Sequence, residues 1–144
     1  MLFENILVPY DLSKCSNHAF KVALNMAEKY DSKLNVLTCI EGDPWHHKFY
    51  DSRADAELLK NQRKAAEEYT SKLEEAAKKK NIKITTKVIK TESIIKQIIS
   101  FTKSKKIDLV VMGSHGRTGF DRFILGSVTN GVAQKVNCPV LIVK

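Results

Sequence analysis

The chain has 144 residues, of which 43% are hydrophobic and 28% are charged, and its net charge is +8. This length suits one domain over residues 1–144 with a substantial core, and the composition excludes a disordered chain. The longest apolar runs, 109–112 and 140–143, are too short to cross a bilayer, so we expect no membrane partner.

Five apolar stretches alternate with four stretches of helical periodicity. The strands are expected at 3–9, 34–40, 82–89, 107–112 and 138–143. The helices are expected after a cap at Ser13 or Ser16, over 52–80, after a cap at Thr91 or Ser93, and over 127–136. For the long second helix, the sequence predicts a buried face of Leu58, Ala65, Tyr69, Leu73 and Ala76. The least regular segment is 42–51, with Trp45, His46 and His47.

The alternating order β-α-β-α-β-α-β-α-β predicts an α/β fold: a single doubly wound, Rossmann-like sheet of five parallel strands with helices on both faces. In such sheets, ligands bind beyond the carboxyl ends of the strands, where the winding reverses. For the strand order 3-2-1-4-5, the reversal falls between strands one and four. The loops that begin at Pro9 and Gly113 would then face one crevice.

Four of the six glycines fall within one stretch, M-G-S-H-G-R-T-G-F-D-R-F-I-L-G-S-V, at 112–128. Gly113 and Gly116 follow an expected strand, and Gly126-Ser127 opens an expected helix. Phosphate binding needs backbone N–H groups that a ligand can approach closely, which glycine and a helix N-terminus both provide. The alternative is an ordinary strand-to-helix loop, but the spacing G-x-x-G, nine residues, G-S favours a phosphate site. Neither a Walker loop nor the dinucleotide fingerprint is present.

Over essentially its whole length, the chain resembles the universal stress protein family. The resemblance rests on I-L-V-P-Y-D-L-S near the start, D-L-V-V-M-G-S-H-G-R-T-G, L-G-S-V-T, and the closing C-P-V-L-I-V-K. The ATP-binding members of that family share G-x-x-G-x(9)-G-[ST], which this chain matches with Gly113, Gly116, Gly126 and Ser127. One departure is Lys90-Thr91-Glu92, where the family usually has glycine and a small residue or proline after strand three.

The resemblance implies the strand order 3-2-1-4-5, a homodimer joined by the last strands (138–143), and a nucleotide-dependent regulatory role in a stress response. It also implies ATP as ligand, with Mg²⁺, and an unidentified protein partner. The ATP-binding residues that it implies are Pro9, Tyr10, Asp11, Cys39, Met112, Gly113, Ser114, His115, Gly116, Arg117, Thr118, Gly119, Gly126, Ser127, Val128 and Thr129.

Three polar side chains near the crevice have alternative roles. Asp11 is either a ribose or metal-linked contact, or a helix cap or the acceptor of an Asx turn. Cys39 is expected to be an apolar wall, because no neighbour in the sequence would lower its pKa. His115 either contacts phosphate or shapes the loop.

Catalysis is less well supported than binding, because hydrolysis needs a group that positions water and cations that neutralise the phosphates. No Walker-type lysine or catalytic carboxylate stands out, so a slow ATPase or phosphotransferase is the alternative. A nucleic-acid binder is the third hypothesis: the lysines at 78–80 and 103–106 are expected mainly to complement helix dipoles. Three scattered cysteines and the absence of a basic signal-peptide start predict a cytoplasmic protein.

Overall fold

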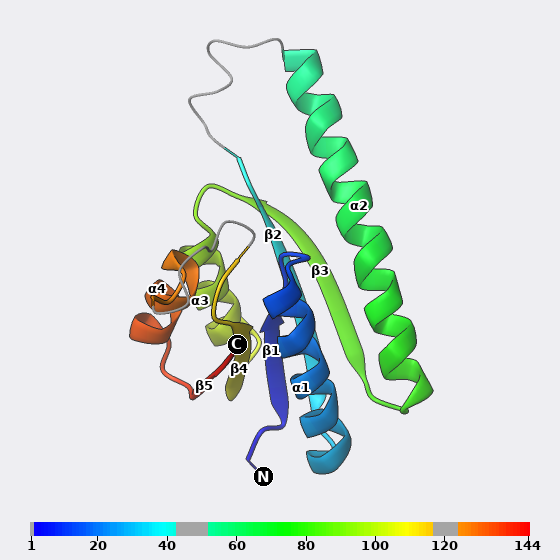
Figure 1. Cartoon of the computed structure of the whole chain (residues 1–144), viewed down its shortest axis with the longest axis vertical. Helices are drawn as coiled ribbons and strands as arrows, with labels where there is room; N and C mark the ends of the chain where they lie inside the picture. Colours follow the sequence, from blue (N-terminus) through cyan, green and yellow to red (C-terminus); the bar gives the residue numbers. More distant parts are fainter. Residues whose placement is uncertain (1, 43–51, 117–123) are drawn as a thin grey trace.

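The computed structural model describes residues 2–42, 52–116 and 124–144. Its centre is a five-stranded parallel sheet in the order β3-β2-β1-β4-β5 (Figure 1), which confirms the predicted fold class and strand order. The strands are β1 Asn5–Pro9, β2 Lys33–Glu41, β3 Ile84–Thr91, β4 Leu109–Gly113 and β5 Val140–Val143. The helices are α1 Lys14–Tyr30, α2 Ser52–Lys79, α3 Ile94–Ser104 and α4 Ser127–Lys135.

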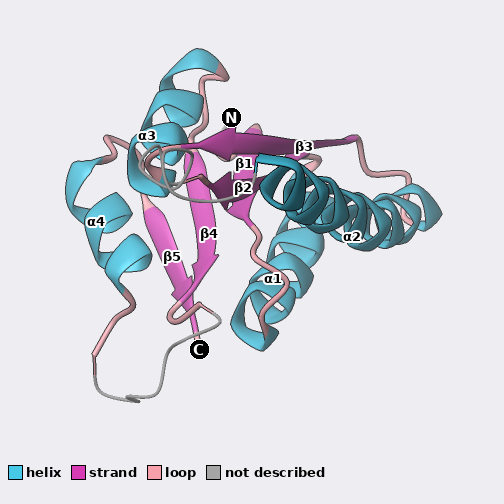
Figure 2. Cartoon of the chain, turned by 90° about the horizontal axis from the view of Figure 1, so that it is seen from above, coloured by secondary structure: helices cyan, strands magenta, loops and turns pink. Residues whose placement is uncertain are grey.

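The helices form two layers, one on each face of the sheet (Figure 2). Alternate residues of β1 separate the two halves of the core: Ile6 and Val8 pack with α1 and α2, whereas Leu7 packs with α3 and α4. This alternation follows from the two-residue period of a strand. Because both faces are covered, the three central strands are nearly continuous apolar runs, as the sequence indicated.

The helix caps resolve two of the open choices. Ser13 caps α1, where its side chain accepts the Ser16 N–H, and Ser93 caps α3, where its side chain accepts the Lys96 N–H. The predicted first strand began too early. Phe3 has a φ of 66°, which a strand does not adopt, and its ring packs edge-on against Tyr30 instead.

The predicted buried face of α2 is confirmed near the end of the helix, where Leu73 and Ala76 pack against the core. Earlier in the helix it is wrong by one residue: Ala65 and Tyr69 are exposed, as is Leu58, whereas Ala66 and Thr70 are buried. One residue corresponds to a rotation of about 100° about the helix axis. Thr70 tolerates burial because its hydroxyl donates to the Glu67 carbonyl, 3.2 Å away, one turn earlier.

Strand β3 extends further at its carboxyl end than predicted. The added residues, Lys90 and Thr91, belong to the segment that differs from the usual family sequence. Lys90 and Thr91 belong to the strand and pair with Ile40 and Glu41 of β2. The Lys90 side chain also covers Gly42, whose added Cβ would lie 2.6 Å from the lysine Cε. Among the described residues, no helix is both long and apolar enough to cross a membrane. The 43–51 part of the irregular segment lies outside those residues.

Candidate functional site

A pocket of about 330 Å³ lies beyond the carboxyl ends of the central strands, at the point where the winding of the sheet reverses. It receives residues from the ends of β1, β2 and β4, from α3, and from the first turn of α4. Twelve residues of the expected set line it: Pro9, Tyr10, Asp11, Cys39, Met112, Gly113, His115, Gly116, Gly126, Ser127, Val128 and Thr129. Arg117, Thr118 and Gly119 fall outside the described residues.

Two glycines of the pocket have close neighbours at the position where a side chain would begin. A Cβ on Gly113 would lie 2.6 Å from the Cβ of Cys15, in the first turn of α1, and one on Gly116 would lie 2.8 Å from Oδ2 of Asp11. Both glycines have ordinary negative φ. Gly113 is therefore required for space, because the atoms it would meet are fixed to α1, whereas a methyl group on Gly116 would displace the Asp11 carboxylate. The bare backbone of both glycines lines the pocket.

The second half of the glycine pattern is fixed to the first by hydrogen bonds. The Gly126 N–H donates to the Ser114 carbonyl over 2.8 Å, and the buried Thr129 hydroxyl donates to the Gly113 carbonyl over 2.7 Å. The first N–H groups of any helix have no intrahelical partner. In α4 the N-cap is Gly126, which has no side chain to accept from them. These donors lie at the pocket, beside Ser127 and Val128.

At the end of β1, Asp11 and Tyr10 have clear structural roles. The Asp11 carboxylate accepts the Ser13 N–H at 3.0 Å, which is the Asx turn proposed as one alternative. The Tyr10 hydroxyl donates to Oδ1 of Asn17 at 2.6 Å. Burial, with smaller contributions from Tyr69 and Asp11, raises the pKa of Tyr10, so this hydroxyl stays a neutral donor.

The opposite wall of the pocket is apolar. Leu37 and Cys39 of β2, Ile94 and Ile98 of α3 and Met112 of β4 pack together in one apolar cluster that lines the pocket. Burial raises the pKa of the Cys39 thiol to about 11, so this group is a neutral wall and not a thiolate nucleophile. Such a surface suits a flat aromatic ring.

Four lining residues were not predicted from the sequence: Ser16, Leu37, Ile94 and Ile98. Leu37 shares a face with Cys39 because strand side chains alternate, so its position could have been deduced. Ile94 and Ile98 lie one helical turn apart in the first half of α3, the end that a parallel sheet places at the carboxyl edge of the strands, but in the sequence both read as ordinary core positions.

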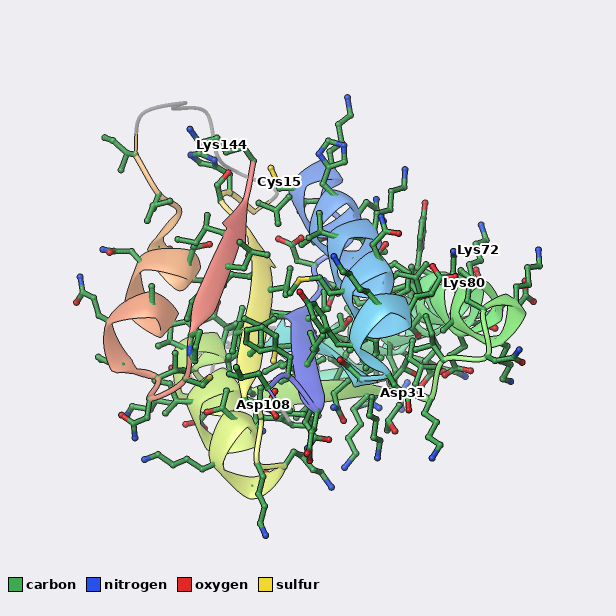
Figure 3. All side chains as sticks on the ribbon, turned by 90° about the horizontal axis from the view of Figure 1, so that it is seen from below. Cys15, Asp31, Lys72, Lys80, Asp108 and Lys144 are labelled. Atoms are coloured by element: carbon green, nitrogen blue, oxygen red, sulfur yellow. The ribbon has the colours of Figure 1, made fainter. Side chains whose placement is uncertain are left out.

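Ser114, behind the pocket wall, and His115, on the wall itself, connect the segments before and after residues 117–123. Ser114 is buried and does not line the pocket; its hydroxyl lies 2.9 Å from Nδ1 of His115 and 3.9 Å from the sulfur of Cys15 (labelled in Figure 3). Nε2 of His115 hydrogen-bonds to the carbonyl oxygen of Ile124. His115 thus connects the two described ends of the loop, which favours its loop-shaping role.

A metal ion would have few protein ligands here. Within the described residues, no three His, Cys, Asp or Glu side chains are grouped so that they could hold a metal. Asp11 is the one carboxylate among the described pocket residues. Mg²⁺ commonly binds through one or two carboxylates and the phosphates of its nucleotide, so a single carboxylate fits that mode.

Comparison with known proteins identifies the family. The sequence model of the universal stress protein family matches residues 2–144. The chain belongs to this family. It is 32% identical over 145 residues to universal stress protein MJ0531 of Methanocaldococcus jannaschii, covering 99% of this chain and 83% of that protein. It is 37% identical over 156 residues to MJ0577 of the same organism, covering 100% and 96%.

Solved structures of family members share the fold. UspA of Lactobacillus plantarum superposes with a TM-score of 0.87 at 24% identity, covering 100% of this chain and 99% of that one. Two further neighbours were solved with nucleotides. One is a universal stress protein in complex with cAMP (TM-score 0.68, 22% identity, covering 99% and 98%). The other is an Archaeoglobus fulgidus member in complex with dAMP (TM-score 0.70, 19% identity, covering 100% of both chains).

Proposed function

We propose that this universal stress protein binds ATP in the pocket and acts as a nucleotide-dependent regulatory protein in a stress response. One observation carries the proposal: both halves of the glycine pattern, Gly113 with Gly116 and Gly126 with Ser127, line a single pocket. That pocket also has an apolar wall opposite the glycines. A nucleotide is the ligand class that needs both kinds of surface.

The polar side supports phosphate binding. The uncapped first turn of α4 offers N–H groups and the positive end of a helix dipole. Gly113 and Gly116 carry no side chain that would keep phosphate oxygens from the backbone. In the proposed complex, the phosphates lie between these two segments, and Asp11 contacts the ribose or a Mg²⁺ ion that the phosphates carry.

The apolar side supports adenine. Leu37, Cys39 and Ile98 provide a wall without charge, and the raised pKa of Cys39 keeps it so at neutral pH. The two neighbours solved with cAMP and with dAMP carry adenine nucleotides on the same fold. This agreement favours an adenine base over other flat rings.

The test of this proposal begins with the protein as purified. Denaturation followed by chromatography of the released small molecules identifies any nucleotide that is carried through purification. Isothermal titration calorimetry with ATP, with and without Mg²⁺, then measures binding to nucleotide-free protein. The expected result is saturable binding of ATP with one site per chain. The proposal is refuted if no nucleotide is released from the purified protein and added ATP gives no binding heat.

Turnover of ATP is the alternative to simple binding. Oδ1 of Asp11 is occupied by a backbone N–H, and the described lining of the pocket has no lysine and no second carboxylate that would neutralise phosphate or position water. We therefore expect phosphate release no faster than the background rate while ATP is bound. Release above background that disappears in the Gly116→Ala variant would instead establish a slow ATPase or phosphotransferase.

We also propose a homodimer through the last strand. β5 is an edge of the sheet: it pairs with β4 on one side, and Leu141 remains 38% exposed. An open edge with an exposed apolar side chain is a natural place for a second copy to pair. Sedimentation equilibrium provides the test, with a mass of about twice the 16.3 kDa chain expected.

A further inference from the structure

We propose that the end of the molecule opposite the pocket binds the phosphate backbone of a nucleic acid, without sequence preference. In a sheet whose strands are all parallel, the turns that precede the strands gather at one end. Three of these turns, at 28–33, 78–83 and 103–108, form what we call the basic end. Its lysines are Lys29, Lys33, Lys78, Lys79, Lys80, Lys83, Lys103, Lys105 and Lys106.

The three turns lie side by side. Lys80 forms an ion pair with Glu28 at 2.8 Å, which joins the second turn to the first. The Lys33 N–H donates to the Glu4 carbonyl, and the Asp108 carboxylate accepts the Glu4 N–H, so the first and third turns meet at the start of β1. In Figure 3, Asp108 and Asp31 are labelled on the lower side of the picture, where the strands begin, and Lys80 is labelled to the right.

The charge of the basic end is strongly unbalanced. Nine lysines stand against three acids within the three turns, Glu28, Asp31 and Asp108, and all nine lysines are exposed. Within the described part of the chain, only Lys80 of the nine forms an ion pair. The carboxylate of Asp108 is already used by the backbone N–H groups of Glu4 and Asn5. A surface with this charge attracts polyanions.

Helix dipoles account for only part of this pattern. Lys29, Lys78, Lys79 and Lys103 lie in the last turns of their helices, where a cation is favourable. Lys80 directly follows α2 and Lys105 is the C-cap of α3, so the dipoles also favour these two. Lys33, Lys83 and Lys106 lie further along the turns, and the dipoles do not account for their position.

The exposed side chains between the lysines favour a nucleic acid over a membrane. Tyr30 is 41% exposed, and Lys29 Nζ lies 5.9 Å from its ring centroid. An aromatic ring among lysines is the arrangement on which single-stranded nucleic acids stack. The large apolar side chains exposed here in the described structure are Tyr30 and Leu2. This is much less than the apolar helix face that holds a protein in a bilayer interface.

The experiment compares two triple variants that lose the same charge. Lys33→Gln, Lys83→Gln and Lys105→Gln together remove three lysines from the basic end. Lys21→Gln, Lys60→Gln and Lys64→Gln remove three exposed lysines from the helices outside it. The probe is a fluorescein-labelled single-stranded DNA 20-mer of mixed sequence, and its anisotropy is measured from about 50 to 200 mM salt, the range over which phosphate contacts change affinity most visibly.

The wild-type protein is expected to bind the probe with a steep dependence on salt. The basic-end variant should lose affinity on the order of tenfold at low salt. The slope of log K against log salt should become shallower by about 2, since each phosphate contact to a single strand contributes about 0.7. The control variant should keep the wild-type slope. Saturating ATP, at matched ionic strength, should leave probe binding unchanged, because the pocket lies at the other end of the sheet.

Four results would overturn the proposal. The first is an absence of binding at 50 mM salt, and the second is an equal loss in the two variants, which would mean that only total charge matters. The third is displacement of the probe by ATP, which would place the oligonucleotide in the nucleotide pocket. The fourth is that the protein sediments with phosphatidylserine vesicles but does not bind the oligonucleotide.

Discussion

Gly113→Ala tests whether the glycine after β4 is required for space. The added methyl group would lie 2.6 Å from the Cβ of Cys15, 2.8 Å from the carbonyl carbon of that residue and 3.1 Å from its carbonyl oxygen. Two of these atoms belong to the backbone of α1, so no side-chain rotation removes the clash. The start of α1 must move away from β4, or β4 must shift in the sheet.

The expected loss of stability is moderate. Overpacking by one methyl group in a well-packed region costs about 1–3 kcal/mol. Replacing glycine with alanine also restricts the unfolded chain, which offsets about 0.4–1 kcal/mol of this cost. The free energy of unfolding should therefore fall by about 1–2 kcal/mol, and each kcal/mol lowers Tm by about 2–4 °C in a chain of this size.

Urea unfolding of nucleotide-free protein measures this loss without a contribution from binding. Gly126→Ala is the matched control, because its added methyl group would lie 3.3 Å from the Ser114 carbonyl oxygen and 3.5 Å from the Cα of His115. A shift of a few tenths of an ångström accommodates that methyl group. The Gly126 variant should therefore lose clearly less stability than the Gly113 variant.

The reasoning is refuted if Gly113→Ala unfolds at the wild-type urea midpoint, or if Gly126→Ala is equally destabilised. A second variant locates the clash. Adding Cys15→Ala to Gly113→Ala should restore little stability, because alanine keeps the Cβ and the backbone that the methyl group meets. Full rescue would show that the cysteine sulfur, and not α1 itself, is the obstacle.

Three further predictions concern the pocket wall, the loop and the sheet edge. In a Cys15→Ser, Cys138→Ser background, Cys39 should react with iodoacetamide at pH 8 roughly two orders of magnitude more slowly than an exposed thiol, because its pKa is about 11. The stability gained from this protonated thiol should be present below pH 9 and lost as the pH rises towards 11; a rate like that of an exposed thiol would contradict the burial. Thr129→Val should cost about 1–3 kcal/mol in urea unfolding, because it leaves the buried Gly113 carbonyl without its donor, whereas Thr129→Ser keeps the hydroxyl and most of the stability; equal losses would exclude that hydrogen bond. Leu141→Lys should give a monomer in sedimentation equilibrium, whereas Leu58→Lys, at a 58% exposed position on α2, should leave the dimer intact; a dimer in both would exclude the β5 edge.

The strand order and the layers of the fold could be predicted because the central strands are apolar runs separated by helical patterns. The first part of the α2 face could not, because the chain places similar residues side by side there: Leu58 with Leu59, and Ala65 with Ala66. Two apolar stripes one residue apart fit the helical period equally well. Only packing against the sheet, at β2 and β3, selects between them, and that contact is not visible in the sequence.

The glycine half of the pocket could be predicted because its residues are close together in the chain and have few alternative roles. The apolar half could not be predicted in full. Ile94 and Ile98 read as ordinary core positions, and Ile98 is indeed 1% exposed within the core. Their place on the pocket depends on how far α3 extends past the end of β4, which is set by the turn after β3.

The same parallel topology separates the two proposed binding regions. Loops that follow the strands carry the glycines, and turns that precede them carry the lysines, so β1, with five residues, holds the regions roughly 17 Å apart. At that distance, substitutions with no shared contacts act independently. Gly116→Ala should therefore weaken ATP binding, since its methyl group displaces the Asp11 carboxylate, and leave oligonucleotide affinity unchanged. The triple lysine variant of the basic end should show the reverse. A variant that combines both sets should lose ATP affinity only by as much as Gly116→Ala does, and oligonucleotide affinity only by as much as the triple variant does. A larger loss of either affinity in the combined variant would mean that the two regions share one ligand.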